Sequence, residues 1–241
     1  MEMTRAAFMK FAIGGSAACA AAVGGFRIAR AETAGSAALP LSQTLSVDPE
    51  WEQANQESIG ELVRAAHVDL PTVKARVAAE PRLANARFMQ FDEAPIEAAS
   101  HMGRPDIAHY LLGCGAPLTM HCAVMLGLYE TAEAYLRRDK SLAIKPGAHG
   151  ISMMFHAAFS GDTAVTQLLV DNGGAQDFTP ALHAAAWKNR PTMVSWLIEH
   201  GAELNRPDFK DRTPLAVAIE MGSTDAEAVL RAAGAALEAS S

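Results

Sequence analysis

The chain has 241 residues, half of them hydrophobic and 6% aromatic, and its formal net charge is −7. This length suits one ordinary domain or a repeat array of moderate length. The acidic charge repels phosphate backbones and so argues against nucleic acid as a partner. Beyond the N-terminal region the sequence has no long, strongly apolar stretch, so we expect no membrane span there.

The first 31 residues have the features of a secretory signal peptide. Arg5 and Lys10 precede an uncharged, Ala- and Gly-rich stretch, and Ala29-Arg30-Ala31 supplies a small-residue cleavage pattern. Residues 4–10 resemble the twin-arginine export motif, except that Ala6 stands where the second arginine belongs. We therefore expect removal of residues 1–31 and a periplasmic or secreted location, by a twin-arginine-like or a general secretory route.

Two other interpretations of this region remain open. Residues 1–31 are Ala-rich and would also be compatible with a disordered tail. Cys19 follows Ser16-Ala17-Ala18 and would be a lipidation site, although Ser16 stands where such sites favour an aliphatic residue.

Residues 32–56 are predicted to be a linker, because small residues dominate and no hydrophobic period is present. Trp51 is expected to pack on the first repeat. Removal of the signal peptide would leave Cys114 and Cys122 as the two cysteines. They could pair in an oxidising compartment, but their spacing does not decide between a disulfide and two free thiols.

A short pattern recurs through the rest of the chain: a start that contains Pro or His, a pair of small residues, and then a turn-forming residue. It occurs at residues 94–99, 119–123, 154–158, 179–186 and 213–218. The turn positions, 24 to 34 residues apart, are Asp69, Gly103, Gly127, Gly161, Asn189 and Gly222. Repetition at a nearly fixed period predicts a stacked array, here with units at 58–91, 92–116, 117–148, 149–177, 178–210 and 211–236.

Each part of the pattern has a physical role. The small pair allows adjacent first helices to approach closely, and Gly or Asn permits a left-handed turn between the two helices of a unit. Pro105 and Pro191 follow the turn and predict the starts of second helices, where a missing N–H costs nothing. Thr179 and Thr213 are predicted N-caps of first helices.

This pattern resembles the ankyrin repeat, whose period is about 33 residues and whose signature is T-P-L-H-x-A. The resemblance implies an all-α solenoid of about six helix–turn–helix repeats over residues 57–236, some with short β-hairpin fingers, and a C-terminal tail at 237–241. It also implies that His121 and His183 form structural hydrogen bonds between units. The short spacing between Gly103 and Gly127 predicts a truncated finger in the second unit.

Proteins with this architecture bind partner proteins through the concave face formed by first helices and fingers. The register predicts an exposed strip with aromatic residues on that face, a profile typical of protein recognition. Packing on neighbouring repeats is the alternative role for these side chains. The predicted partner-binding residues are His101, Cys122, Met125, His156, Phe159 and Trp187, with Phe91 and Phe209 at finger tips.

No motif in the sequence indicates catalysis. It lacks the nucleophile elbow, the zinc-protease helix motif and the phosphate loop, so we expect a non-enzymatic protein without a cofactor or metal. The alternative is a periplasmic protein that binds copper, because soft sulfur and imidazole ligands gather in the third and fourth units. These ligands are Met120, His121, Cys122, Met125, Met153, Met154 and His156.

Overall fold

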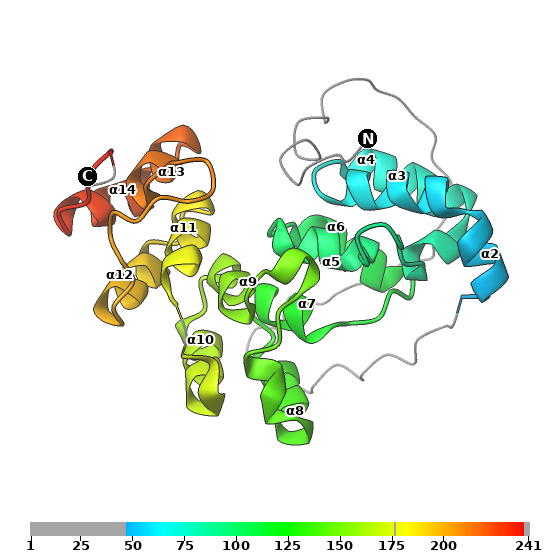
Figure 1. The fold of residues 1–241 in the computed structure, drawn as a ribbon, viewed down its shortest axis with the longest axis horizontal. Coiled ribbons are helices and arrows are strands. Elements are labelled where there is room, and N and C mark those ends of the chain that lie inside the picture. Colours follow the sequence, from blue (N-terminus) through cyan, green and yellow to red (C-terminus); the bar gives the residue numbers. More distant parts are fainter. Residues whose placement is uncertain (1–46, 176, 239–241) are drawn as a thin grey trace, which may run out of the picture.

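The computed structural model describes residues 47–175 and 177–238 and arranges them as a curved row of helix pairs (Figure 1). The predicted signal peptide and residues 32–46 of the predicted linker lie outside the described residues. The first helices of the six units are α3 (Gln56–Ala66), α5 (Pro95–His101), α7 (Met120–Met125), α9 (Met153–Ser160), α11 (Thr179–Trp187) and α13 (Pro214–Glu220). The second helices are α4 (Leu70–Ala79), α6 (Pro105–Gly113), α8 (Tyr129–Arg138), α10 (Thr163–Leu169), α12 (Pro191–Glu199) and α14 (Thr224–Ala232).

The first helices stack on one another in chain order and form the continuous core of the array. The predicted small pairs make this contact possible: Ala98-Ala99 on α5 and Ala157-Ala158 on α9 are completely inaccessible to solvent. Second helices cover the other side with buried side chains such as Leu111 and Leu197. The all-α solenoid predicted from the repeats is thus confirmed. Among the described residues, no helix combines the length and apolar character needed to cross a bilayer.

The predicted turns and helix starts are confirmed at most positions. Five of the six turn residues have a positive φ, between 52° and 78°; Asp69 instead caps α4 through its side chain, which accepts the Thr72 N–H. Thr213 caps α13, but Thr179 lies inside α11. The Thr179 hydroxyl accepts the N–H of Glu203 and so holds the next finger.

The end of the predicted linker is helical and extends the first unit. Residues Pro49–Ala54 form α2, capped by Asp48, and α3 follows within two residues. Trp51 packs against the core as expected, and the Arg82 guanidinium lies 4.2 Å from the centre of its ring. The alternation of polar and apolar residues in this helix is too short to show as a hydrophobic period.

The connections between units carry little β-structure. Within the described residues the single pairing is an isolated antiparallel bridge between Phe88 and Glu93, with a turn between them. The structure agrees with the truncated finger predicted for the second unit, because only residues 114–119 join α6 to α7.

The array bends sharply at the third unit. Helices α5 and α9 contact each other across the short α7, whereas α6 and α8 pack together less than other neighbouring second helices do. In Figure 1, α8 accordingly points away from α6. Phe159 of α9 reaches the turn of the second unit, where a Cβ on Gly103 would lie 2.7 Å from its ring. The absence of a side chain at Gly103 therefore permits the close approach.

Candidate functional site

The strip predicted to be exposed on the concave face is mostly buried, so this expectation is corrected. Trp187 is half-buried, whereas the other five side chains are at most 3% exposed: His101, Cys122, Met125, His156 and Phe159. Two features of the fold cover them. The bend brings α5 and α9 into contact, and the connection at 144–151 folds back over the first helices.

The two predicted structural histidines form hydrogen bonds, but each bond lies within one unit and does not join two units as expected. Nε2 of His121 donates to the carbonyl of Lys145 at 3.1 Å, and Nε2 of His183 donates to the carbonyl of Arg206 at 3.0 Å. Each bond ties a first helix to the connection at the end of the same unit. These bonds position the loop at 144–151 and the finger at 202–213 on the concave side.

A groove with a volume of about 610 Å³ runs along the concave side between the first units and the last. One wall comes from α3 and the end of α5, and the other comes from α11, α13 and the finger between α12 and α13. Three of the predicted binding residues line it: His101, Trp187 and Phe209. The apolar side chains along it are Val68, Met102, Ile151, Phe155, Pro180, Trp187, Pro207, Phe209, Val217 and Met221.

The two predicted finger-tip residues differ in exposure. Phe209 is 73% exposed and stands at the edge of the groove. Phe91 is half-buried and packs edge-on against Phe88, with the His149 ring 5.9 Å away. The Phe88–Glu93 bridge closes the turn on which Phe91 lies and directs the ring inward, so Phe91 is not an exposed tip.

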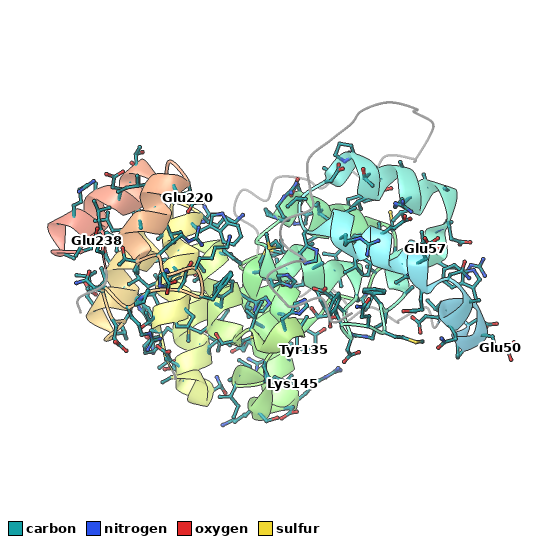
Figure 2. The ribbon with its side chains drawn as sticks, turned by 45° about the horizontal axis from the view of Figure 1, so that its top comes forward. Glu50, Glu57, Tyr135, Lys145, Glu220 and Glu238 are labelled. Atoms are coloured by element: carbon teal, nitrogen blue, oxygen red, sulfur yellow. The ribbon has the colours of Figure 1, made fainter. Side chains whose placement is uncertain are left out.

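Charged side chains at the groove are partly neutralised by one another. Arg206 pairs with Asp177 and Glu203, and Arg212 pairs with Asp208 and with Glu220 of α13, which Figure 2 labels. Arg64 and Lys210 also line the groove, and in the described part of the chain neither forms an ion pair. The groove therefore offers two uncompensated positive charges beside an apolar floor.

A second feature lies beside the groove: a cluster formed by His67, Glu93, His101 and His149. Glu93 is completely buried, and its carboxylate oxygens lie 3.1 Å from His101 Nδ1, 3.2 Å from His149 Nε2 and 3.9 Å from His67 Nε2. Burial opposes ionisation of Glu93, but the neighbouring imidazoles outweigh it and lower its pKa to about 2. Burial and the adjacent His101 lower the pKa of His67 to about 4. Glu93 is thus held as a carboxylate and His67 as a neutral imidazole.

Among the residues considered for copper binding, His121, Cys122 and His156 belong to no group of three described His, Cys, Asp or Glu side chains close enough to share an ion. The four methionines are at most 4% exposed and pack in the core. Cys114 and Cys122 are both free thiols in the structure, and burial raises the pKa of Cys122 to about 12, which keeps it protonated. In the described ranges, the group of His, Cys, Asp and Glu side chains close enough to share an ion is the one around Glu93.

A partial signal for this cluster is present in the sequence. His67 and His101 occupy the same register position, two residues before the turn residue, in two adjacent units. Equivalent positions on stacked helices are neighbours, and their ring centres lie 4.8 Å apart. Glu93 and His149 come from irregular connections whose path no periodicity predicts.

Comparison with known families agrees with this architecture. Residues 120–208 and 154–240 match the family described as ankyrin repeats (3 copies), and together they cover half of the chain. The chain belongs to the ankyrin repeat family. It is similar to the inactive serine/threonine-protein kinase TEX14 of Mus musculus, with 28% identity over 130 residues, which are 45% of this chain and 9% of that protein. The chain thus spans less than a tenth of the length of this relative.

Ankyrin repeats are protein–protein interaction modules and typically act as non-enzymatic scaffolds. Membership in the family therefore assigns this chain to the class of interaction proteins. Which face it uses and what it binds depend on the groove and on the side chains that line it.

Proposed function

We propose that this protein binds an extended segment of a partner protein in the groove of its concave side. The observation that carries the proposal is the groove itself, about 610 Å³ in volume and lined largely by apolar side chains from both ends of the array. A space of this size accommodates several side chains of an extended segment, but not a folded domain.

Exposed apolar side chains at the groove support a binding role. Phe209, Met221 and Val68 are 73%, 42% and 42% exposed, and all three border the same space. A contiguous patch of exposed apolar side chains marks an interaction site, because its burial against a partner is energetically favourable. Trp187 supplies a half-buried aromatic anchor between them, and aromatic anchors often dominate binding energy.

The uncompensated charges define the chemistry of the partner. Arg64 and Lys210 stand at the groove without an ion-pair partner among the described residues. A bound segment with apolar side chains and flanking carboxylates would cover the floor and neutralise both cations. Opposite charge at the rim also speeds association.

A peptide selection tests this proposal. A displayed library of random dodecapeptides is selected against the purified protein, and the affinity of enriched peptides is measured by fluorescence polarisation. We expect apolar peptides with acidic residues whose affinity falls about tenfold or more in Trp187→Ala and Met221→Ala. Met89→Ala is the matched control, because Met89 is 47% exposed but lies outside the groove. Equal affinity for all variants would contradict binding in the groove.

We also propose that the protein is exported and acts in the periplasm or outside the cell. The support is the sequence of residues 1–31, with its basic start, apolar centre and small-residue end. Expression of the full chain in a Gram-negative host, followed by fractionation and mass spectrometry, tests it. A periplasmic product that begins at Glu32 is expected, and an uncleaved cytoplasmic product would count against export.

A further inference from the structure

We propose that His67, Glu93, His101 and His149 form a binding site for a divalent transition-metal ion of the zinc class. One potential ligand atom from each residue lies within 4.8 Å of the others. Three imidazoles and one carboxylate are a ligand set that zinc accepts in proteins, commonly in a tetrahedral arrangement. This set differs from the Met, His and Cys residues considered for copper.

The spacing of the ligand atoms fits a shared ion. Two ligands on a tetrahedral zinc ion lie about 3.4 Å apart, because each bond is about 2.1 Å long. The Glu93 oxygens lie 3.1, 3.2 and 3.9 Å from the nearest nitrogens of His101, His149 and His67. Small side-chain rotations therefore close the cluster around one ion.

Two atoms at the centre of the cluster lack a hydrogen bond. Glu93 Oε1 and His101 Nδ1 are buried and only 3.1 Å apart, yet within the described structure neither makes a hydrogen bond of acceptable geometry. Unsatisfied buried polar atoms are costly and need an explanation. A metal ion between these atoms would satisfy both, because each would direct a lone pair toward it.

The ligands are held in place by the surrounding backbone. The Nδ1–H of His67 donates to the carbonyl of Val63 at 2.7 Å, which leaves Nε2 to face Glu93. Such a bond from the second ring nitrogen orients metal-binding histidines. Glu93 is fixed by both backbone hydrogen bonds of its bridge with Phe88, at 2.8 and 3.1 Å.

His149 is positioned by an unusual loop. Its backbone φ is 59°, a left-handed conformation that is uncommon outside glycine, and the loop is closed by the bond from Gly147 N–H to the carbonyl of Ile151 at 2.8 Å. The conformation turns His149 toward Glu93 of an earlier connection. A non-glycine residue persists in this region only where its surroundings determine it.

The charge balance also favours a cation. The ion-pair partners of Glu93 are the three imidazoles, whereas the nearby Arg87 pairs with Asp92 and Glu97. A buried carboxylate requires a compensating positive charge. A divalent ion supplies it while the three imidazoles remain neutral ligands.

The site would connect three units of the array. His67 belongs to the first unit, His101 to the second, and His149 to the connection after α8, so one ion would fasten this connection over the first helices. His67 and His101 also line the groove. Metal binding would therefore stabilise one wall of the groove, which is a structural role and not a catalytic one.

Zinc titration of the metal-free chain tests the site. The purified protein is treated with a chelator, dialysed, and titrated with ZnCl₂ in a calorimeter, with melting followed by circular dichroism. We expect 1:1 binding and a higher melting temperature. His149→Ala and Glu93→Gln should weaken zinc binding by about a hundredfold, whereas His109→Ala, at an exposed histidine outside the cluster, should leave it unchanged.

A second readout identifies the ligands. Cobalt(II) in place of zinc should give the intense visible absorption of a tetrahedral site without the band of a thiolate ligand, and Cys114→Ser should not alter it. If Glu93→Gln does not fold, His149→Ala decides the outcome, because His149 is half-buried on a loop. Unchanged zinc affinity in His149→Ala, no zinc binding by the native chain, or loss of the cobalt spectrum in Cys114→Ser would each overturn the proposal.

Discussion

Burial gives individual histidines different properties in the same array. His156 is almost completely buried, and its Nδ1 donates to the carbonyl of Ser152 at 2.8 Å. Burial, and to a lesser degree the neighbouring His121, lower the pKa of His156 to about 3. His109, by contrast, is exposed on α6. The folded protein therefore holds some imidazoles in the neutral form well below the pH at which free histidine gains a proton.

This difference predicts a specific acid sensitivity. Below pH 6.5 the unfolded chain protonates His156, but the folded chain does so only near pH 3, so the free energy of unfolding falls as pH decreases through this window. One such histidine contributes about 1.4 kcal/mol per pH unit. In urea titrations at pH 7 and pH 5, His156→Asn should therefore lose about 2 kcal/mol less stability than the native chain. The control variant His109→Asn should lose as much stability between pH 7 and pH 5 as the native chain. If His156→Asn also lost as much as the native chain, the acid sensitivity could not be assigned to His156.

Helices in this protein are completed by residues of neighbouring units. The N-cap of α14 is Ser223, whose hydroxyl donates instead to the carbonyl of Trp187 at 3.1 Å. The open N–H groups of Asp225 and Ala226 donate to the side-chain oxygen Oδ1 of Asn189, at 3.1 and 2.9 Å. The turn of the fifth unit thus caps the second helix of the sixth.

Removal of this cap should weaken the last unit. Asn189 has a φ of 52°, and glycine adopts that conformation without strain, so Asn189→Gly removes the cap but keeps the turn. We expect a loss of about 1–2 kcal/mol in the free energy of unfolding and faster amide hydrogen exchange in α14. Unchanged exchange in α14 would show that water replaces the cap without cost.

The sequence predicts elements better than it predicts their curvature. Small pairs and turn residues are local requirements, so positions such as Ala98-Ala99 and Gly127 could be placed from the pattern alone. The burial of Phe159 depends on an approach to Gly103 across a whole unit, and periodicity contains no such distance. For the same reason the exposed strip was predicted wrongly, while Trp187 and Phe209, beyond the bend, line the groove.

At the scale of the whole molecule, each unit is stabilised mainly by its immediate neighbours. First helices contact the next first helix, and α5 with α9 is the exception that the bend creates. Stability in such arrays is close to a sum of unit and interface terms, and opening can remain local. A destabilising substitution in the last unit should therefore leave the stability of the first units unchanged.

A core substitution in the last unit tests this independence. Leu215 is 1% exposed on α13, and Leu215→Ala should cost about 2–5 kcal/mol by leaving a cavity. We expect faster amide exchange in α13 and α14 and unchanged protection in α3 and α5, measured by mass spectrometry. Equally faster exchange in all helices would mean that the array unfolds as one unit.

The brevity of the segment between α6 and α7 has a consequence for how such a protein can diversify. Residues 114–119 lie where the row of helices turns, and none of them lines the groove. The width of the groove and the composition of its walls are therefore encoded in separate stretches of sequence. If this segment had the length found in an ordinary repeat, the bend would be less sharp and the two walls of the groove would lie farther apart. A larger bound segment could thus be accommodated by a longer connection between α6 and α7, without any change in the residues that contact it.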